Sequence, residues 1–197
     1  MEFEQVVRRR RMVRNFDGRP VPPEVVERLL TNANRAPSAG FTQGCDLLAL
    51  EGPEQTSRFW ASSRSPDGDD ARTTWPGVLR APVLIVVLAS EAAYRARYSE
   101  PDKQRSHSGD QRWLVPYWHV DAGFAALLAL LTAVDQGLGA LFFGVADATG
   151  LRAEFGIPDT HEPVGAVAVG YALPDRPSGS LSRRRRPLDQ VVHRGRW

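Results

Sequence analysis

The chain has 197 residues, 42% of them hydrophobic, with a formal net charge of +2 and a single cysteine. This length suits one domain with a real core, and one cysteine excludes an intramolecular disulfide and a metal site built from cysteines. Acidic residues and arginines follow Met1 with no apolar segment among them, so we expect no signal peptide and a cytoplasmic protein.

The positive charge is concentrated at the two ends of the chain. Residues 1–19 hold six arginines against three acids (+3), residues 183–197 hold six against one (+5), and residues 20–182 hold 13 basic and 19 acidic residues (−6). Arginine clusters suit phosphate, because each guanidinium makes paired charge-assisted hydrogen bonds. A solvated helix face or a nucleic-acid patch are the alternatives. The acidic middle and the lack of a nucleic-acid-binding motif argue against nucleic acid as a partner.

The N-terminal third predicts two helices joined by an extended, proline-rich segment. Apolar residues recur at helical spacing in 2–11 and 24–35, and the prolines of 19–23 restrict the chain between them to extended conformations. The second helix ends in a loop of small residues, 36–44, whose two glycines would let the backbone approach a ligand closely. An ordinary helix-to-strand loop is the alternative reading.

The middle of the chain predicts two strands and two helices. The clearest strand is 83–88, a continuous run of mostly β-branched residues that we expect to be buried on both faces. The other expected features are a strand at 46–50, helices at 55–64 and 91–98, polar loops at 62–77 and 99–112, and an aromatic cluster of Trp113, Tyr117 and Trp118.

The most apolar stretch runs from Trp118 to Val145. Residues 122–131 are all non-polar, which predicts a helix buried on every side, and the run is shorter than the about 20 residues that span a bilayer. Glycines at 137 and 139 end this helix, and 141–143 reads as a short buried strand that stops at Gly144. The end of this strand is a candidate floor for a cofactor site.

The C-terminal part predicts a helix at 146–155 with Asp147 as its N-cap, and a buried strand at 163–171. A linker at 174–182 leads to a final segment, 183–197, which keeps apolar residues and is expected to pack on a neighbouring subunit. About four strands and six helices in irregular order predict an α+β fold around one central sheet, with 1–197 as a single domain.

Five segments resemble, in chain order, the motifs of the FMN-dependent nitroreductase family. Residues 10–16, RRMVRNF, resemble its opening RRSxRxF, and residues 121–139 resemble its core helix DxGxAxxxLxLxAxxxGLG. Residues 20–40, 163–170 and 183–188 resemble its second helix with the loop that follows, its late strand and its closing basic element. Together these segments span nearly the whole chain.

The resemblance implies a nitroreductase-like α+β fold, with a mainly antiparallel sheet flanked by helices. It implies an intertwined homodimer in which 183–197 wraps the partner and FMN lies at the subunit interface. The implied cofactor-binding residues are Arg10, Arg11, Met12, Arg14, Phe143, Gly144, Arg183 and Arg185, with Pro37, Ser38, Ala39 and Gly40 approaching from the other subunit. The candidate substrate-binding residues are Phe41, Trp113 and Tyr117, with Trp118 and the 99–112 loop as further walls.

The same resemblance implies an NAD(P)H-dependent flavin oxidoreductase that passes hydride through FMN to a flat conjugated acceptor, such as a nitroaromatic or a quinone. Because a flavin carries the redox chemistry itself, we expect no catalytic side chain and no metal, and we take the four scattered histidines as structural or surface residues. The chain departs from the family pattern at Met12, at Phe41 with Thr42, and at Gly44 with Cys45. The alternative is a flavin- or deazaflavin-binding module with little turnover; a remote alternative is nucleic-acid binding through the arginine tracts.

Overall fold

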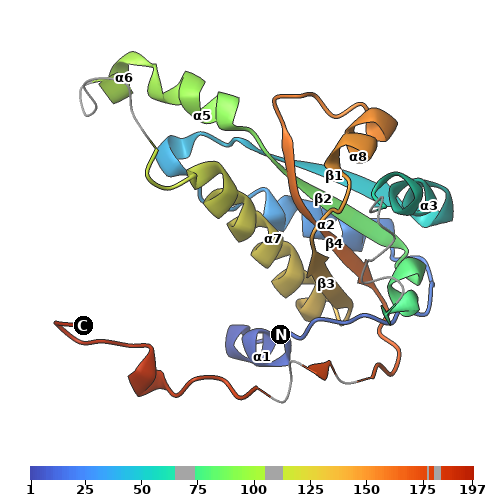
Figure 1. Ribbon diagram of the computed structural model, residues 1–197. Coiled ribbons are helices and arrows are strands. Elements are labelled where there is room, and N and C mark those ends of the chain that lie inside the picture. Colours follow the sequence, from blue (N-terminus) through green and yellow to red (C-terminus); the bar gives the residue numbers. More distant parts are fainter. Residues whose placement is uncertain (65–73, 105–112, 177, 180–182) are drawn as a thin grey trace.

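A computed structural model describes residues 1–64, 74–104, 113–176, 178–179 and 183–197. Four antiparallel strands form one sheet in the order β1-β2-β4-β3, which confirms the expected α+β architecture (Figure 1). The strands are β1 (Cys45–Glu51), β2 (Val83–Ala89), β3 (Gly139–Phe143) and β4 (Glu162–Gly170). The α-helices of the described residues are α1 (Phe3–Arg9), α2 (Pro23–Ala33), α3 (Gly52–Ser62), α5 (Glu91–Tyr98), α6 (Pro101–Gln104), α7 (Tyr117–Asp135) and α8 (Ala148–Phe155).

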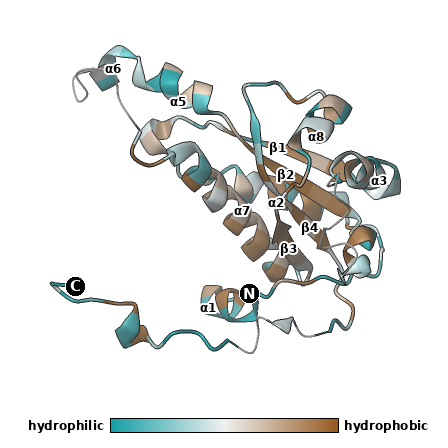
Figure 2. Ribbon diagram, in the orientation of Figure 1, coloured by the Kyte–Doolittle hydropathy of each residue, from teal (hydrophilic) through white to brown (hydrophobic). Residues whose placement is uncertain are grey.

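Strand β2 lies at the centre of the molecule and is buried along its whole length, as predicted. Because successive side chains of a strand point to opposite faces, β2 contributes to two cores. Val83, Ile85 and Val87 join a core beneath α2 and α7, while Leu84 and Val86 join a core beneath α3 and α8. The sheet is therefore covered by helices on both faces, and Figure 2 shows β2 and most of α7 as hydrophobic.

Helix α7 packs along one face of the sheet, but it is not buried on every side. Val120, Phe124 and Leu127 are 36%, 42% and 45% exposed, although the opposite side of the helix lies in the core. By length and composition the 19-residue helix could cross a membrane, yet half of its most apolar window is buried inside the fold. The expectation of complete burial is thus wrong for the single chain, which leaves an apolar stripe on α7 in solvent.

Several element boundaries differ from the sequence expectations. The first helix is expected to run to residue 11, but α1 ends at Arg9. The chain is extended from Arg10, because Met12 pairs with Ala140 of β3. Helix α3 begins at Gly52, with Pro53 in its first turn. The short helix α6 falls inside the expected polar loop 99–112, and a 3-10 turn, η2 (Pro76–Arg80), begins in the last two residues of the expected loop 62–77. Residues 65–73 and 105–112 of those loops lie outside the described residues.

The last segment, residues 183–197, is an exposed arm with a single 3-10 turn, η4 (Leu188–Gln190). It extends away from the sheet past α1 (Figure 1). Trp197 is 99% exposed, and its ring stacks on His193 of the same arm at 4.1 Å. Apolar side chains that are exposed in one chain are what an arm that packs on a second chain would show.

Candidate functional site

The N-terminal basic segment lies along the free edge of β3. Met12 forms a parallel bridge with Ala140, and the Val13 amide donates to the Ala140 carbonyl at 2.9 Å. Side chains of an extended segment alternate between two sides, so Arg10, Met12 and Arg14 share one side. Arg11 and Val13 share the other, where Arg11 lines a pocket with Arg9 and residues 137–139. The structure therefore separates Arg11 from the two arginines that flank it.

Arg14 is half-buried and held by its own chain. Its amide donates to Oδ2 of Asp175 at 2.9 Å, and Nη1 donates to the Met12 carbonyl at 3.3 Å. The guanidinium lies 5.2 Å from the ring of Trp75, which Arg176 also approaches at 4.6 Å. Two guanidinium groups thus gather on one indole ring, with the Asp175 carboxylate as the neighbouring negative charge, and guanidinium groups suit an anionic ligand.

The end of β3 presents backbone instead of an aromatic ring. Phe143 stacks on Trp60 at 5.3 Å with an interplanar angle of 18°, and meets Phe59 edge-on at 6.0 Å. Its ring is thus packed in the core beneath α3. Gly144 follows, exposed, and apart from Gly144 and its two chain neighbours no described atom lies within 4 Å of the position that a Cβ would take. A planar group can approach the backbone there without meeting a side chain of Gly144 itself.

The loop after α2 holds the second group of predicted cofactor residues, Pro37, Ser38, Ala39 and Gly40. It contains the 3-10 turn η1 (Ala39–Phe41), in which Gly40 has φ of 64°. Two bonds anchor it to other elements: the Ala39 amide donates to Oδ2 of Asp121 at 2.7 Å, and Nε of Arg97 donates to the Gly40 carbonyl at 3.1 Å. The loop is therefore fixed to α7 and α5.

The aromatic residues predicted as substrate walls lie beside this loop. The ring of Trp113 makes edge-on contacts with Tyr98 at 4.7 Å and with Tyr117 at 6.0 Å. Tyr98 in turn packs on the loop so closely that a Cβ at Gly40 would lie 2.9 Å from its Cε2. Phe41 projects from the same loop into solvent. Phe41, Trp113 and Tyr117 are thus brought to one end of the molecule.

The predicted site residues fall into two groups at opposite edges of the sheet. Arg10, Arg14 and Gly144 lie at the β3 edge, whereas the 37–41 loop leads into β1 at the other edge. Arg183 and Arg185 lie on the exposed C-terminal arm. One copy of the chain does not assemble these groups into one site, so a site that uses all of them requires two copies.

No group of three or more histidine, cysteine or acidic residues that could hold a metal is found in the described residues. His119 contacts Glu162 at 3.0 Å and His161 contacts Asp46 at 2.7 Å, both at the surface, and His107 lies outside the described residues. Sequence reasoning missed Asp121, Tyr94 and Arg97 as groups that fix the loop. The only local signal for Asp121 is a lone acid at the border of an apolar helix.

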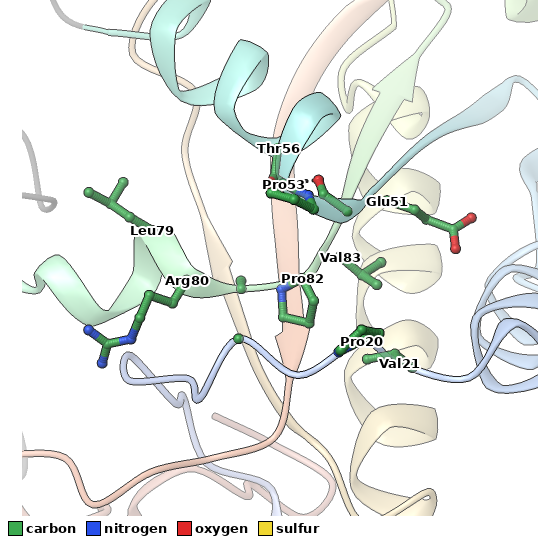
Figure 3. A pocket seen from close by; sticks show the side chains of 12 residues that line it. Pro20, Val21, Glu51, Pro53, Thr56, Leu79, Arg80, Pro82 and Val83 are labelled. Carbon is green, nitrogen blue, oxygen red and sulfur yellow. Dashed lines mark hydrogen bonds between the residues drawn. The ribbon is translucent and has the colours of Figure 1, made fainter.

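A cavity of about 390 Å³ lies at the other end of the β1–β2 pair from the loop (Figure 3). Its walls are mostly apolar, with Pro20, Val21 and Pro82 on one side. Arg80 is already bound, because Nε donates to the Phe16 carbonyl at 2.8 Å and Nη2 donates to the side chain of Asn15. None of the predicted site residues lines this cavity.

The chain is similar to proteins of the nitroreductase family in both sequence and fold. A model of the nitroreductase family matches residues 7–171. An NADPH-dependent oxidoreductase of Staphylococcus aureus (strain USA300) is 24% identical over 98% of this chain and 72% of its own length. A nitroreductase family protein from Clostridium difficile 630 superposes with a TM-score of 0.73 at 22% identity, covering all of both chains. A protein described as a nitroreductase, solved in complex with FMN, from Desulfovibrio desulfuricans, gives a TM-score of 0.68 at 23% identity, covering 98% of this chain and 95% of that one.

Proposed function

The chain belongs to the nitroreductase family, and from this premise we propose that it is an FMN-dependent oxidoreductase that takes hydride from NAD(P)H. The proposed acceptor is a flat conjugated molecule such as a nitroaromatic or a quinone. The observation that carries the proposal is the β3 edge, where two half-buried arginines lie along the strand that ends at the open backbone of Gly144. An NADPH-dependent relative and an FMN complex of a structural neighbour support the choice of donor and cofactor.

The residues at the β3 edge fit a flavin nucleotide. When bound, FMN would accept hydride from the donor and deliver it to the acceptor, so the protein needs to supply binding, orientation and charge. We assign Arg10 and Arg14, with Met12 between them, to the phosphate, the ribityl chain and the pyrimidine edge, and the backbone of Phe143 and Gly144 to the ring. Arg183 and Arg185 would add to the phosphate site, and Arg11, which faces the other side of its segment, would contribute least.

The proposed functional unit is a homodimer. The 37–40 loop and the arginines lie at opposite edges of one sheet, and a two-fold partner would bring the loop of one copy to the arginines of the other. The exposed stripe Val120, Phe124 and Leu127 would supply an apolar interface, as would the C-terminal arm. A cavity of about 440 Å³ between α1, α2 and α7, lined by Phe3, Leu128 and Leu131, would receive part of the partner.

We propose a small-molecule enzyme of the cytoplasm. The acidic middle of the chain argues against nucleic acid as a partner, and the burial of half of α7 argues against a membrane. Phe41, Trp113 and Tyr117 would contact the acceptor, since aromatic rings stack on flat conjugated molecules.

The test begins with purified protein and added FMN. Uptake of flavin, followed by oxidation of NADH or NADPH in the presence of a quinone or a nitroaromatic, is the expected result. A protein that takes up no flavin would overturn the proposal. A protein that holds flavin but oxidises neither donor with any such acceptor would be a binding module instead of an enzyme.

A further inference from the structure

Asp121 is a buried carboxylate in the second turn of α7. It is 4% exposed, and its Oδ2 accepts two hydrogen bonds, from the Ala39 amide at 2.7 Å and from the Tyr94 hydroxyl at 2.5 Å. A charge removed from water costs several kcal/mol unless it is well bonded, so an acid on the buried side of a mostly apolar helix requires an explanation. Both of its bonds lead to the 37–41 loop or to the helix that packs on it.

The loop that Asp121 holds has an unfavourable backbone conformation. Phe41 and Gln43 have φ of 54° and 55°, and Gly40 between Ala39 and Phe41 has φ of 64°. A bulky residue in this left-handed region costs of order 1–3 kcal/mol and persists only when its surroundings fix it. Here the Gln43 amide also donates to Oγ of Ser38 at 2.9 Å, and Oγ1 of Thr42 donates to the Ala39 carbonyl at 2.6 Å.

The result of this conformation is that the ring of Phe41 stands in solvent, 76% exposed. Neither the strained backbone nor the exposed ring stabilises the single chain. A ring that stays in water contributes no hydrophobic free energy to folding. Strained backbone that is fixed by several contacts is typical of sites that hold a side chain ready for a ligand. The loop that carries this ring packs on Tyr98 through Gly40, and the ring of Tyr98 in turn meets Trp113 edge-on.

We propose that Asp121 is a positioning residue, which with Tyr94 holds the loop in the left-handed shape that presents Phe41 to an aromatic acceptor. The inference rests on the proposed flavin oxidoreductase activity for the identity of the acceptor, but not for the hydrogen bonds. Tyr94 is suited to the role because burial, followed by the bond to Asp121, raises the pKa of its phenol well above its usual range. A raised pKa keeps the hydroxyl protonated, which is the form that donates to Asp121.

The test compares Asp121→Ala with the conservative variant Asp121→Asn, whose amide oxygen can still accept both bonds. With a quinone as acceptor we expect Asp121→Ala to raise the KM for the quinone about tenfold with little change in kcat. Asp121→Asn should have a quinone KM close to that of the wild-type protein. The assays contain saturating FMN, because the 37–40 loop is also assigned to the cofactor and a weaker affinity for FMN must not limit the rate. Under these conditions ferricyanide, which has no ring to stack, should be reduced by the wild-type protein and both variants at similar rates. Equal losses with quinone and ferricyanide would overturn the proposal, because they would indicate a general defect in the protein or its cofactor site.

Coupling to Phe41 gives the decisive control. In a Phe41→Ala background, Asp121→Ala should add no further increase in the quinone KM, since the ring that it positions is gone. Additive effects would show that Asp121 acts elsewhere and would overturn the proposal.

A readout independent of activity is hydrogen exchange at the Ala39 amide. We expect slow exchange in the wild-type protein and faster exchange in Tyr94→Phe and Asp121→Ala. Equal exchange in all three would overturn the assignment of Asp121 as the anchor of the loop. A wild-type protein with a protected Ala39 amide but no flavin would overturn the proposed function and the acceptor assignment, while it would support the anchor itself.

Discussion

Arg10 and Arg11 are neighbours in the sequence but face opposite sides of one extended segment, because the segment pairs with β3 at Met12. Replacing Arg10 with alanine is expected to weaken FMN binding by about 1.5–3 kcal/mol, or roughly 10- to 150-fold, the loss of one charge-assisted hydrogen bond. Arg185→Ala should have a similar effect. Arg11→Ala is the matched control and should change the affinity much less. Flavin fluorescence titration measures all three, and an equal loss at Arg10 and Arg11 would contradict the assignment.

Cys45 lies at the start of β1, half-buried near Asp121, and its thiol should be unreactive. Burial raises the pKa of the Cys45 thiol to about 11, and the charges of Asp46 and Asp121 add to this. At pH 8 only about 0.1% of such a thiol is thiolate, the form that reacts with iodoacetamide. We expect alkylation of the folded protein to be about 100-fold slower than that of the urea-unfolded protein. Its rate should rise about tenfold per pH unit up to about pH 11.

Asp46→Asn provides a check on the cause of the shift. Removing a negative charge beside Cys45 favours the thiolate, so this variant should lower the thiol pKa and speed alkylation at pH 8. Rapid labelling of the folded wild-type protein at pH 8 would show that Cys45 is not shielded in this way.

At the scale of single elements, α8 depends on its cap. The Asp147 carboxylate accepts a hydrogen bond from the Gly150 amide at 2.8 Å, which satisfies one of the free donors at the start of the helix. Asp147→Ala should lower the free energy of unfolding by about 1 kcal/mol, which corresponds to about 2–4 °C in Tm for a chain of this size. Asp159→Ala removes the same charge from an exposed turn and should have little effect. Thermal unfolding compares the two, and equal shifts would show that charge, not capping, is responsible.

The elements that could be predicted from sequence are those specified by local patterns. The β-branched run of β2 and the cap residue Asp147 each require only a few neighbouring residues, and both predictions are confirmed. The end of α1 at Arg9 was not predictable, because it depends on pairing with Ala140, more than a hundred residues away. The same limit applies to the site: the bond from Ala39 to Asp121 joins residues 82 positions apart, and no local pattern records it.

At the scale of the whole molecule, the sheet order explains why one copy cannot complete the proposed site. Arg10 and Gly144 lie at the β3 edge, and the 37–41 loop lies at the β1 edge of the same sheet. The apolar run of α7 predicted a helix that is buried on every side. In a single chain this prediction is wrong for the stripe Val120, Phe124 and Leu127, which is exposed. A second copy on this stripe would bury it and would supply the missing loop in the same step.

Disruption of the stripe should therefore remove cofactor binding together with assembly. In the double variant Phe124→Asp, Leu127→Asp, two carboxylates would have to lose water at the interface, which opposes association. We expect a monomer by light scattering, with FMN affinity at least tenfold weaker although neither position is an assigned cofactor contact. Leu79→Asp is the matched control, because Leu79 is 41% exposed, close to the 42% of Phe124, but lines the distant cavity of Figure 3. A double variant that stays dimeric, or a monomer that binds FMN as tightly as the wild type, would show that the loop and the arginines do not meet across a two-fold interface.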